Sequence, residues 1–194
     1  ELSKLINHSA DTLLKLIDDI FDIAKIESGV LSVNKKTFSV DEAFMKLEPI
    51  YQDKKIKQNK ENVRFIINKQ EDDITINTDP LRFQQILINL IDNGMKFTED
   101  GFVEVGYRLN KSSDPQNVIF YVKDTGIGMT DEQMNKIFKR FSKIEEDKTK
   151  IYRGAGLGLA ISKNIVALLG GTLWAESEVG KGSIFTLYLP ESVT

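Results

Sequence analysis

Two glycine clusters constrain this chain more than any other feature of its sequence. The first reads Asp-Thr-Gly-Ile-Gly from Asp124 to Gly128, and the second reads Gly-Ala-Gly-Leu-Gly from Gly154 to Gly158. A charged segment with few apolar residues, from Lys136 to Lys150, runs between them. Because glycine leaves the backbone uncovered, this layout indicates a pocket with a lid.

The second cluster leads into a helical pattern. Apolar residues recur after it at the spacing of one helix face, at Leu157, Ile161, Ile165 and Leu168. A bare backbone at a helix N-terminus offers unpaired N–H groups and the positive end of the helix dipole. The pattern therefore predicts an anion-binding turn.

The first cluster suggests a different contact. Asp124 ends a run of strand character, Val118 to Val122. A carboxylate fixed at a strand end beside Gly126 and Gly128 can accept a hydrogen bond from an exocyclic amine, so we expect a purine base there.

The alternative for either cluster alone is an ordinary turn, since glycine is the default turn residue. Two other phosphate motifs are excluded. The second cluster does not match the Gly-x-Gly-x-x-Gly fingerprint of dinucleotide-binding proteins, because one residue instead of two separates its last two glycines. The P-loop sequence Gly-x-x-x-x-Gly-Lys-Ser/Thr does not occur.

Composition sets the class of protein. The length of 194 residues suits one domain plus an appendage. Hydrophobic residues make up 41% and charged residues 28%, as in a folded chain. The net charge of -3 argues against a nucleic-acid partner. There is no cysteine, no signal peptide and no membrane-length apolar run. We expect a cytoplasmic protein, or the cytoplasmic part of a membrane-anchored parent.

The first residues show a heptad pattern that predicts a helix ending near Gly29. Its seam consists of Leu2, Ile6, Ser9, Leu13, Leu16, Ile20 and Ile23. Such a helix needs partners, so we expect a helical bundle and a chain that is a fragment of a longer one; packing on the core of its own domain is the alternative. The only histidine, His8, has no second ligand or acidic neighbour and is interpreted as an exposed bundle residue.

Between residues 30 and 78 we expect extended chain, a helix from Val40 to Lys57, and short strands at Val63 to Ile67 and Ile74 to Asn77. Asp79 and Pro80 then mark the start of a helix. Its predicted buried stripe is Leu81, Ile86, Leu87, Leu90 and Ile91.

Three polar residues share one face of this helix, because Asn89, Asn93 and Lys96 lie four and three residues apart. Amides in mid-helix do not favour the helix. An amide oxygen is a suitable ligand for Mg²⁺, which shares phosphate oxygens, and a lysine one turn on adds positive charge. Four further strands are predicted, at Phe102 to Leu109, Val118 to Lys123, Thr172 to Ser177 and Ile184 to Leu189.

Five segments in this order resemble the sequence boxes of sensor histidine kinases. They are Asn89 to Thr98 (N box), Asp124 to Gly128 (first glycine box), Phe138 to Phe141 (F box), Gly154 to Leu159 (second glycine box) and Gly180 to Thr186 (last glycine box). The resemblance covers roughly residues 38 to 190. Ile20 to Gly29 also resembles the end of the second helix of the dimerisation domain.

The resemblance implies an α+β fold, a two-layer α/β sandwich of the Bergerat type shared with gyrase, the Hsp90 chaperone and MutL, with a mixed sheet covered by helices. It implies that residues 1–29 are the second dimerisation helix and residues 30–194 the catalytic ATP-binding domain.

The resemblance also assigns roles to residues. Asn93 would bind Mg²⁺, Asn89 and Lys96 would act catalytically near the phosphates, and Asp124 would read the adenine amine. Thr186 would line the adenine side, and Phe138 and Phe141 would anchor the root of an ATP lid that ends near Arg153. The implied nucleotide-binding set is Asn89, Asn93, Lys96, Phe97, Asp124, Gly126, Ile127, Gly128, Phe138, Phe141, Arg153, Gly154, Gly156, Leu157, Gly158 and Thr186.

The implied activity is phosphoryl transfer from ATP to a histidine of a dimerisation helix, then to an aspartate of a response regulator, in a homodimeric parent. The sequence contains no phosphoacceptor motif, so we expect ATP binding without autophosphorylation. Departures from the family pattern are Gly94, Arg153 and Ala155. Two alternatives stay open, an ATP hydrolase and a degenerate nucleotide-binding module; Asn89 argues against the hydrolase, because an amide cannot act as a general base.

Overall fold

The structure is a computed structural model that describes residues 2–58, 60–69, 74–110, 117–142 and 156–190. Helix α1 (Leu2–Glu27) forms as predicted, and Gly29 follows it with a positive φ of 66°. The side chain of His8 lies outside the described part of the chain.

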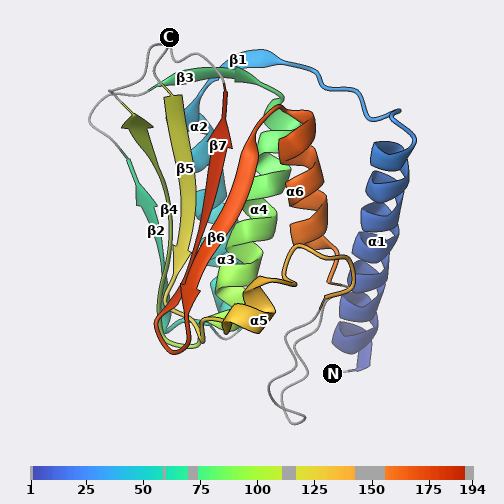
Figure 1. Ribbon diagram of the computed structural model, residues 1–194. Helices are drawn as coiled ribbons and strands as arrows, with labels where there is room; N and C mark the ends of the chain where they lie inside the picture. The colour runs from blue at the N-terminus through green and yellow to red at the C-terminus, as the bar shows by residue number, and fades with distance from the viewer. Residues whose placement is uncertain (1, 59, 70–73, 111–116, 143–155, 191–194) are drawn as a thin grey trace.

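Helix α1 leaves an apolar face uncovered along its described length. It lies beside α6, at the edge of the molecule farthest from the sheet (Figure 1). Its exposed apolar side chains are Leu13, Leu14, Ile17, Ile20 and Phe21.

The region predicted as one helix from Val40 to Lys57 is two helices, α2 (Val40–Met45) and α3 (Leu47–Lys57), which meet at Lys46. The Ser39 side chain caps α2 by accepting a hydrogen bond from the Glu42 N–H at 2.9 Å. Strand β1 (Lys36–Ser39) precedes α2 and pairs with β3 (Thr75–Thr78) in a two-stranded sheet.

Helix α4 (Pro80–Phe97) begins where the sequence predicts. Asp79 is the N-cap, and its Oδ1 accepts hydrogen bonds from the N–H groups of Leu81 and Arg82, at 3.0 and 3.1 Å. The predicted buried stripe is correct except for Leu81, which is 76% exposed and lines a hollow beside Lys15 and Asp19 of α1. Phe83, fully buried, occupies the core instead.

The main sheet has five strands in the order β2-β4-β5-β7-β6. They are β2 (Val63–Asn68), β4 (Gly101–Asn110), β5 (Asn117–Asp124), β7 (Gly182–Leu189) and β6 (Thr172–Glu178). The β2–β4 pair is parallel and the other pairs are antiparallel, so the sheet is mixed as expected. All of the later strand predictions are confirmed within a residue or two.

In the described residues, β5 is followed by two helices. Helix α5 (Asp131–Met134) is a single turn closed by a capping box between Thr130 and Gln133. Helix α6 (Gly158–Leu168) follows the second glycine cluster as predicted, but Leu168 at its last turn is 43% exposed and Leu169 is buried in its place.

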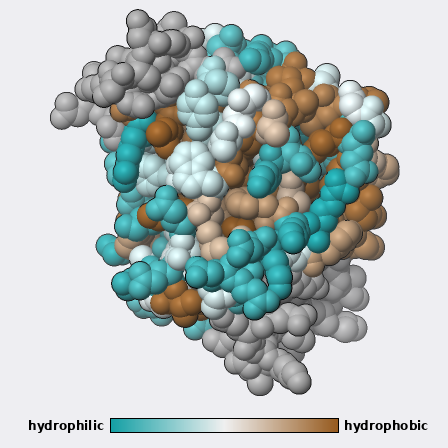
Figure 2. All heavy atoms as spheres, viewed as in Figure 1, coloured by the Kyte–Doolittle hydropathy of each residue, from teal (hydrophilic) through white to brown (hydrophobic). Residues whose placement is uncertain are grey.

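Helices α2, α3, α4 and α6 lie on one face of the five-stranded sheet, which makes two layers (Figure 1). The core between them contains an aromatic cluster in which the rings of Phe83 and Phe120 lie 4.9 Å apart. On the side of the molecule shown in Figure 2, hydrophilic and hydrophobic residues are interspersed on the surface. The α+β sandwich is therefore confirmed, and none of the helices described is long and apolar enough to span a bilayer.

Candidate functional site

The predicted polar face of α4 is present. Asn89 is 8% exposed, while Asn93 and Lys96 are half-buried. The Nζ atom of Lys96 lies 4.5 Å from the centroid of the Phe97 ring. One helix therefore presents two amides and a cation along one side.

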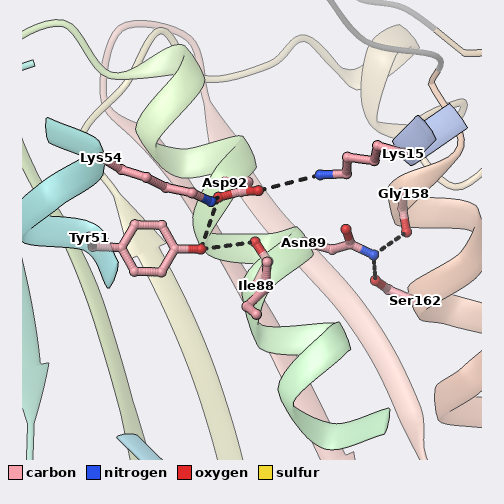
Figure 3. Close-up of polar contacts among 8 residues, drawn as sticks. All are labelled: Lys15, Tyr51, Lys54, Ile88, Asn89, Asp92, Gly158 and Ser162. Atoms are coloured by element: carbon pink, nitrogen blue, oxygen red, sulfur yellow. Dashed lines mark hydrogen bonds and ion pairs between the residues drawn. The ribbon is translucent and has the colours of Figure 1, made fainter. Parts of the chain in front are cut away.

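The amide of Asn89 contacts the first turn of α6 (Figure 3). Its Nδ2 donates to the carbonyl oxygen of Gly158 at 3.4 Å and to Oγ of Ser162 at 3.3 Å. A Cβ added at Gly158 would lie 3.5 Å from the amide of Asn89, an ordinary van der Waals contact. The second glycine cluster and the amide face thus meet directly.

Asp92 points away from this contact (Figure 3). It accepts hydrogen bonds from the Tyr51 hydroxyl at 2.9 Å and from Nζ of Lys54 at 2.7 Å, and Nζ of Lys15 on α1 lies 3.4 Å away. Burial and the neighbouring Asp92 carboxylate raise the pKa of Tyr51. Asp92 therefore joins α1 and α3 to α4, a role that the sequence did not reveal.

Asp124 ends β5 and is 6% exposed. Its Oδ1 accepts a hydrogen bond from the Gly126 N–H at 2.8 Å. Burial raises the pKa of the Asp124 carboxyl, and hydrogen bonds from the N–H groups of Gly126 and Ser183 act in the opposite direction. Backbone N–H groups just after β5 and at the start of β7 thus hold the carboxyl group in place.

The C-terminal half of α4 lies against the Asp124 turn. A Cβ added at Gly94 would lie 3.4 Å from the Asp124 Cβ and 3.0 Å from Cγ1 of Val103, so the absence of a side chain permits close packing here. The carbonyl oxygen of Phe97 accepts a hydrogen bond from the Ile127 N–H at 3.3 Å. With a rise of about 1.5 Å per residue, Asn89 and Phe97 lie roughly 12 Å apart along the axis, the scale of an extended nucleotide.

The glycines of the first cluster pack against the protein's own backbone. A Cβ at Gly126 would lie 2.6 Å from the carbonyl oxygen of Phe97, and one at Gly128 would lie 2.0 Å from that of Glu178. Gly128 also has a φ of 67°, which other residues rarely adopt. The missing side chains of these two glycines make room for the end of α4 and for the β6–β7 turn.

Thr186 lies on the wrong face of the sheet for its predicted role. Side chains alternate along β7, and Ser183 is the residue that pairs with Asp124, so Thr186 points to the opposite face, where it pairs with Tyr121. Ser183 is the residue beside Asp124, and its Oγ lies 2.9 Å from Oγ of Ser177. Since face depends on strand register, sequence reasoning missed Ser183.

A backbone hydrogen bond links the start of the predicted lid to Gly156, beyond its end. The Phe141 N–H donates to the carbonyl oxygen of Gly156 at 3.0 Å. The Phe141 side chain is 69% exposed and its φ is 59°, so the prediction that its side chain anchors the root is wrong. Phe138 does contact the core, and Nζ of Lys163 lies 4.7 Å from its ring centroid.

For three further residues of the predicted nucleotide-binding set, the structure shows no position on a ligand-binding surface. Arg153 and Gly154 lie outside the described residues, as does the departure at Ala155. Leu157 is only 1% exposed, so its side chain is part of the core rather than of a ligand surface.

Comparison with protein families matches residues 78–193 to the histidine kinase-, DNA gyrase B- and HSP90-like ATPases. The matched segment contains α4, both glycine clusters and the whole β4–β7 region. This chain belongs to that ATPase family.

Relatives of this chain are named as sensor kinases or histidine kinases. The autoinducer 2 sensor kinase/phosphatase LuxQ of Vibrio parahaemolyticus is 36% identical over 188 residues, which are 96% of this chain and 22% of LuxQ. The circadian input-output histidine kinase CikA of Synechococcus elongatus is 36% identical over 192 residues, 98% of this chain and 25% of CikA. The chain thus spans about a fifth to a quarter of these relatives, and its ATP-binding domain is of the histidine kinase type.

Solved structures agree in fold. Full-length ShkA in complex with AMPPNP superposes with a TM-score of 0.83 at 26% identity, covering 98% of this chain and 38% of ShkA. Histidine kinase ThkA in complex with the response regulator protein TrrA superposes with a TM-score of 0.73 at 23% identity, covering 98% of this chain and 52% of ThkA. The latter likeness concerns the fold alone.

Neutral amides, rather than a cluster of carboxylates, are the candidate metal ligands of this site. Within the described residues, no three His, Cys, Asp or Glu side chains gather at one point, so a cage of carboxylates is not present there. Asn89 borders a hollow of about 360 Å³ between α1 and α4, whose wall also includes Lys15 and Asp19. Because Asp92 of α4 is paired with Tyr51 and Lys54, the amides of Asn89 and Asn93 are the oxygen ligands on the face of α4 nearest α6.

Proposed function

We propose that this chain binds Mg·ATP and transfers its γ-phosphoryl group to a histidine of a dimerisation helix, as the catalytic region of a sensor histidine kinase. One observation carries the proposal: α4 contacts both the Asp124 turn and the first turn of α6. The names of LuxQ and CikA support the kinase activity, and the AMPPNP complex of ShkA supports the nucleotide.

Asp124 would read the adenine amine. Its carboxyl group is already oriented by the Gly126 and Ser183 N–H groups, which leaves an acceptor for a ligand N–H. Phe97 and Ile127 lie at the same end of α4 and would border the base. Thr186 is excluded from this set by its position on the other face of the sheet.

Asn89, Asn93 and Lys96 would face the phosphates, with the backbone at Gly156 and Gly158 at the start of α6. Arg153 and Gly154 are proposed from the motif alone. Asn93 would hold Mg²⁺ with Asn89 beside it, since neutral amide oxygens leave room for phosphate oxygens and water in its coordination. When bound, the ion neutralises phosphate charge.

The transfer requires position more than acid–base chemistry. The bond between the γ-phosphorus and the bridging oxygen breaks, ADP leaves with the electron pair, and a neutral imidazole nitrogen supplies the pair for the new P–N bond. Lys96 would stabilise the charge on the phosphates. Asn89 cannot take a proton from water, which favours transfer over hydrolysis.

The exposed apolar face of α1 supports a dimerisation helix over residues 1–29, with the catalytic domain over residues 30–194. Apolar side chains such as Leu13 and Phe21 would pack against other bundle helices, so the parent protein would be a homodimer. The resemblance of the sequence boxes to sensor histidine kinases supports a response regulator as the next phosphoryl acceptor.

Titration with AMPPNP, with and without MgCl2, tests the binding proposal. Asp124→Asn is expected to weaken binding about 10- to 100-fold, because a hydrogen bond to a charged acceptor is lost. Asp100→Asn, an exposed site in the turn after α4, is the matched control and should change nothing. Equal affinities of wild type and Asp124→Asn would refute the adenine assignment.

A second measurement separates the rival functions. Mixed with ATP and a dimerisation domain that carries the phosphoacceptor histidine, the chain should produce acid-labile phosphate on that histidine. Steady release of inorganic phosphate without the domain would indicate a hydrolase. Tight nucleotide binding with neither product would indicate a degenerate binding module.

A further inference from the structure

The amide of Asn89 is held at its nitrogen end. Nδ2 has two acceptors on α6, the carbonyl oxygen of Gly158 at 3.4 Å and Oγ of Ser162 at 3.3 Å (Figure 3). Ser162 is fully buried, with an exposed fraction of 0%. A buried serine in mid-helix contributes little to helix stability by itself, so its hydroxyl group needs another explanation.

An amide side chain has a donor end and an acceptor end, and a half-turn of its terminal torsion exchanges them. The Gly158 carbonyl can only accept, so it favours the orientation with nitrogen toward α6. The Ser162 hydroxyl can donate or accept, and in this orientation it accepts from Nδ2 and holds the amide with a second hydrogen bond. The oxygen then points away from α6. No residue in the described part of the chain donates a hydrogen bond to it.

We propose that Ser162 is a positioning residue that fixes the amide of Asn89 with Oδ1 toward the magnesium and phosphate side. This inference rests on the proposed function and names a residue of α6 that the sequence boxes do not assign. Without the Ser162 hydroxyl, Nδ2 loses one of its two acceptors, so the amide turns more freely and more often presents its NH2 group, which repels a cation. The Gly158 carbonyl remains as an acceptor, so the loss is partial.

Metal-dependent affinity tests the proposal. Kd for AMPPNP is measured for the wild type and for Ser162→Ala, once with MgCl2 and once with EDTA. In MgCl2 the Kd of Ser162→Ala is expected to rise about fivefold, the size of one ordinary hydrogen bond. In EDTA it should stay within about twofold, since the base contacts are intact.

Three controls separate positioning from a structural role. Ser162→Thr keeps the hydroxyl and should restore the magnesium-dependent affinity. Thr78→Val removes a buried hydroxyl in β3 and should change neither affinity. In an Asn89→Ala background, Ser162→Ala should have no further effect on the magnesium dependence, because the two residues act through one contact.

NMR provides a readout that does not need nucleotide. The side-chain NH2 signals of Asn89 should shift in Ser162→Ala and return toward their wild-type positions in Ser162→Thr. Unmoved NH2 signals would overturn the proposal, as would equal loss of affinity in MgCl2 and EDTA, or an undiminished Ser162→Ala effect in Asn89→Ala. A wild type without magnesium dependence refutes the metal assignment itself, whereas a magnesium-dependent wild type with an unaffected Ser162→Ala refutes only the positioning role.

Discussion

The Asp124 turn and the α1 side of the molecule are held in opposite ways. At the turn, Asp124 is 6% exposed and the backbones of α4 and the β6–β7 turn approach within contact distance. On the α1 side, Ile23 and Ile26 pack against the core, but the other contacts are polar pairs such as Lys15 with Asp92 and Glu27 with Arg140, beside an exposed apolar face. Buried backbone contacts fix geometry, whereas partly exposed ion pairs contribute little and are easily exchanged. The Asp124 turn is thus built into the packed core, whereas the first half of α1 is held by exchangeable surface contacts.

The largest effect is expected at the turn. Gly128→Ala should lower the free energy of unfolding by about 3 kcal/mol, because its φ is 67° and the new Cβ would lie 2.0 Å from the Glu178 carbonyl oxygen. Urea denaturation measures this. Gly180→Ala, with a φ of 79° and nothing within 4 Å, is the control and should cost only about 1 kcal/mol. Equal losses would mean that close packing does not matter at this turn.

Asp124→Asn should separate stability from binding. Burial of the charged carboxylate disfavours the folded state, so the neutral amide is expected to raise the free energy of unfolding at pH 7 by about 1 kcal/mol, although it weakens nucleotide binding. A lower melting temperature for Asp124→Asn at pH 7 would show that the two backbone N–H groups outweigh desolvation.

The pH dependence follows from the raised pKa of Asp124. In the window above its ordinary value of 3.8, the folded protein holds a proton that the unfolded chain has released. Wild type should therefore gain stability relative to Asp124→Asn as pH falls from 7 toward 4, and nucleotide affinity should fall over the same range. A constant difference in stability would contradict the raised pKa.

Asp22→Ala tests the α1 side. Asp22 accepts hydrogen bonds from Arg82 at 3.4 Å and from Gln85 at 2.6 Å, and its loss should cost at most about 1 kcal/mol. The cost should shrink further in 1 M salt, where such pairs are screened. Asp18→Ala, an exposed neighbour on α1, is the control. A loss as large as that of Gly128→Ala would end the contrast between the two regions.

The smallest effect concerns Phe141 at the root of the lid. A φ of 59° disfavours any residue with a Cβ, so Phe141→Gly should be more stable than Phe141→Ala by roughly 0.5 to 1 kcal/mol. Urea denaturation of both variants measures the difference, and equal stabilities would show that this backbone position is not strained.

Local signals determined much of this protein from sequence alone. The Asp79 cap, the heptad of α1, the glycine-led start of α6 and the alternation of the later strands all depend on residues within about four positions of one another. The order of the sequence boxes likewise predicted the fold class and the family.

Tertiary structure decided which residues share a face and which groups meet. Ser183 rather than Thr186 lies beside Asp124 because a strand's register, set by its neighbours, determines where each side chain points. Ser162 reaches Asn89, and the Phe97 carbonyl fills the space at Gly126, only because α4 lies between two segments far apart in the chain. Such contacts depend on the packing of whole elements, which no short stretch of sequence contains.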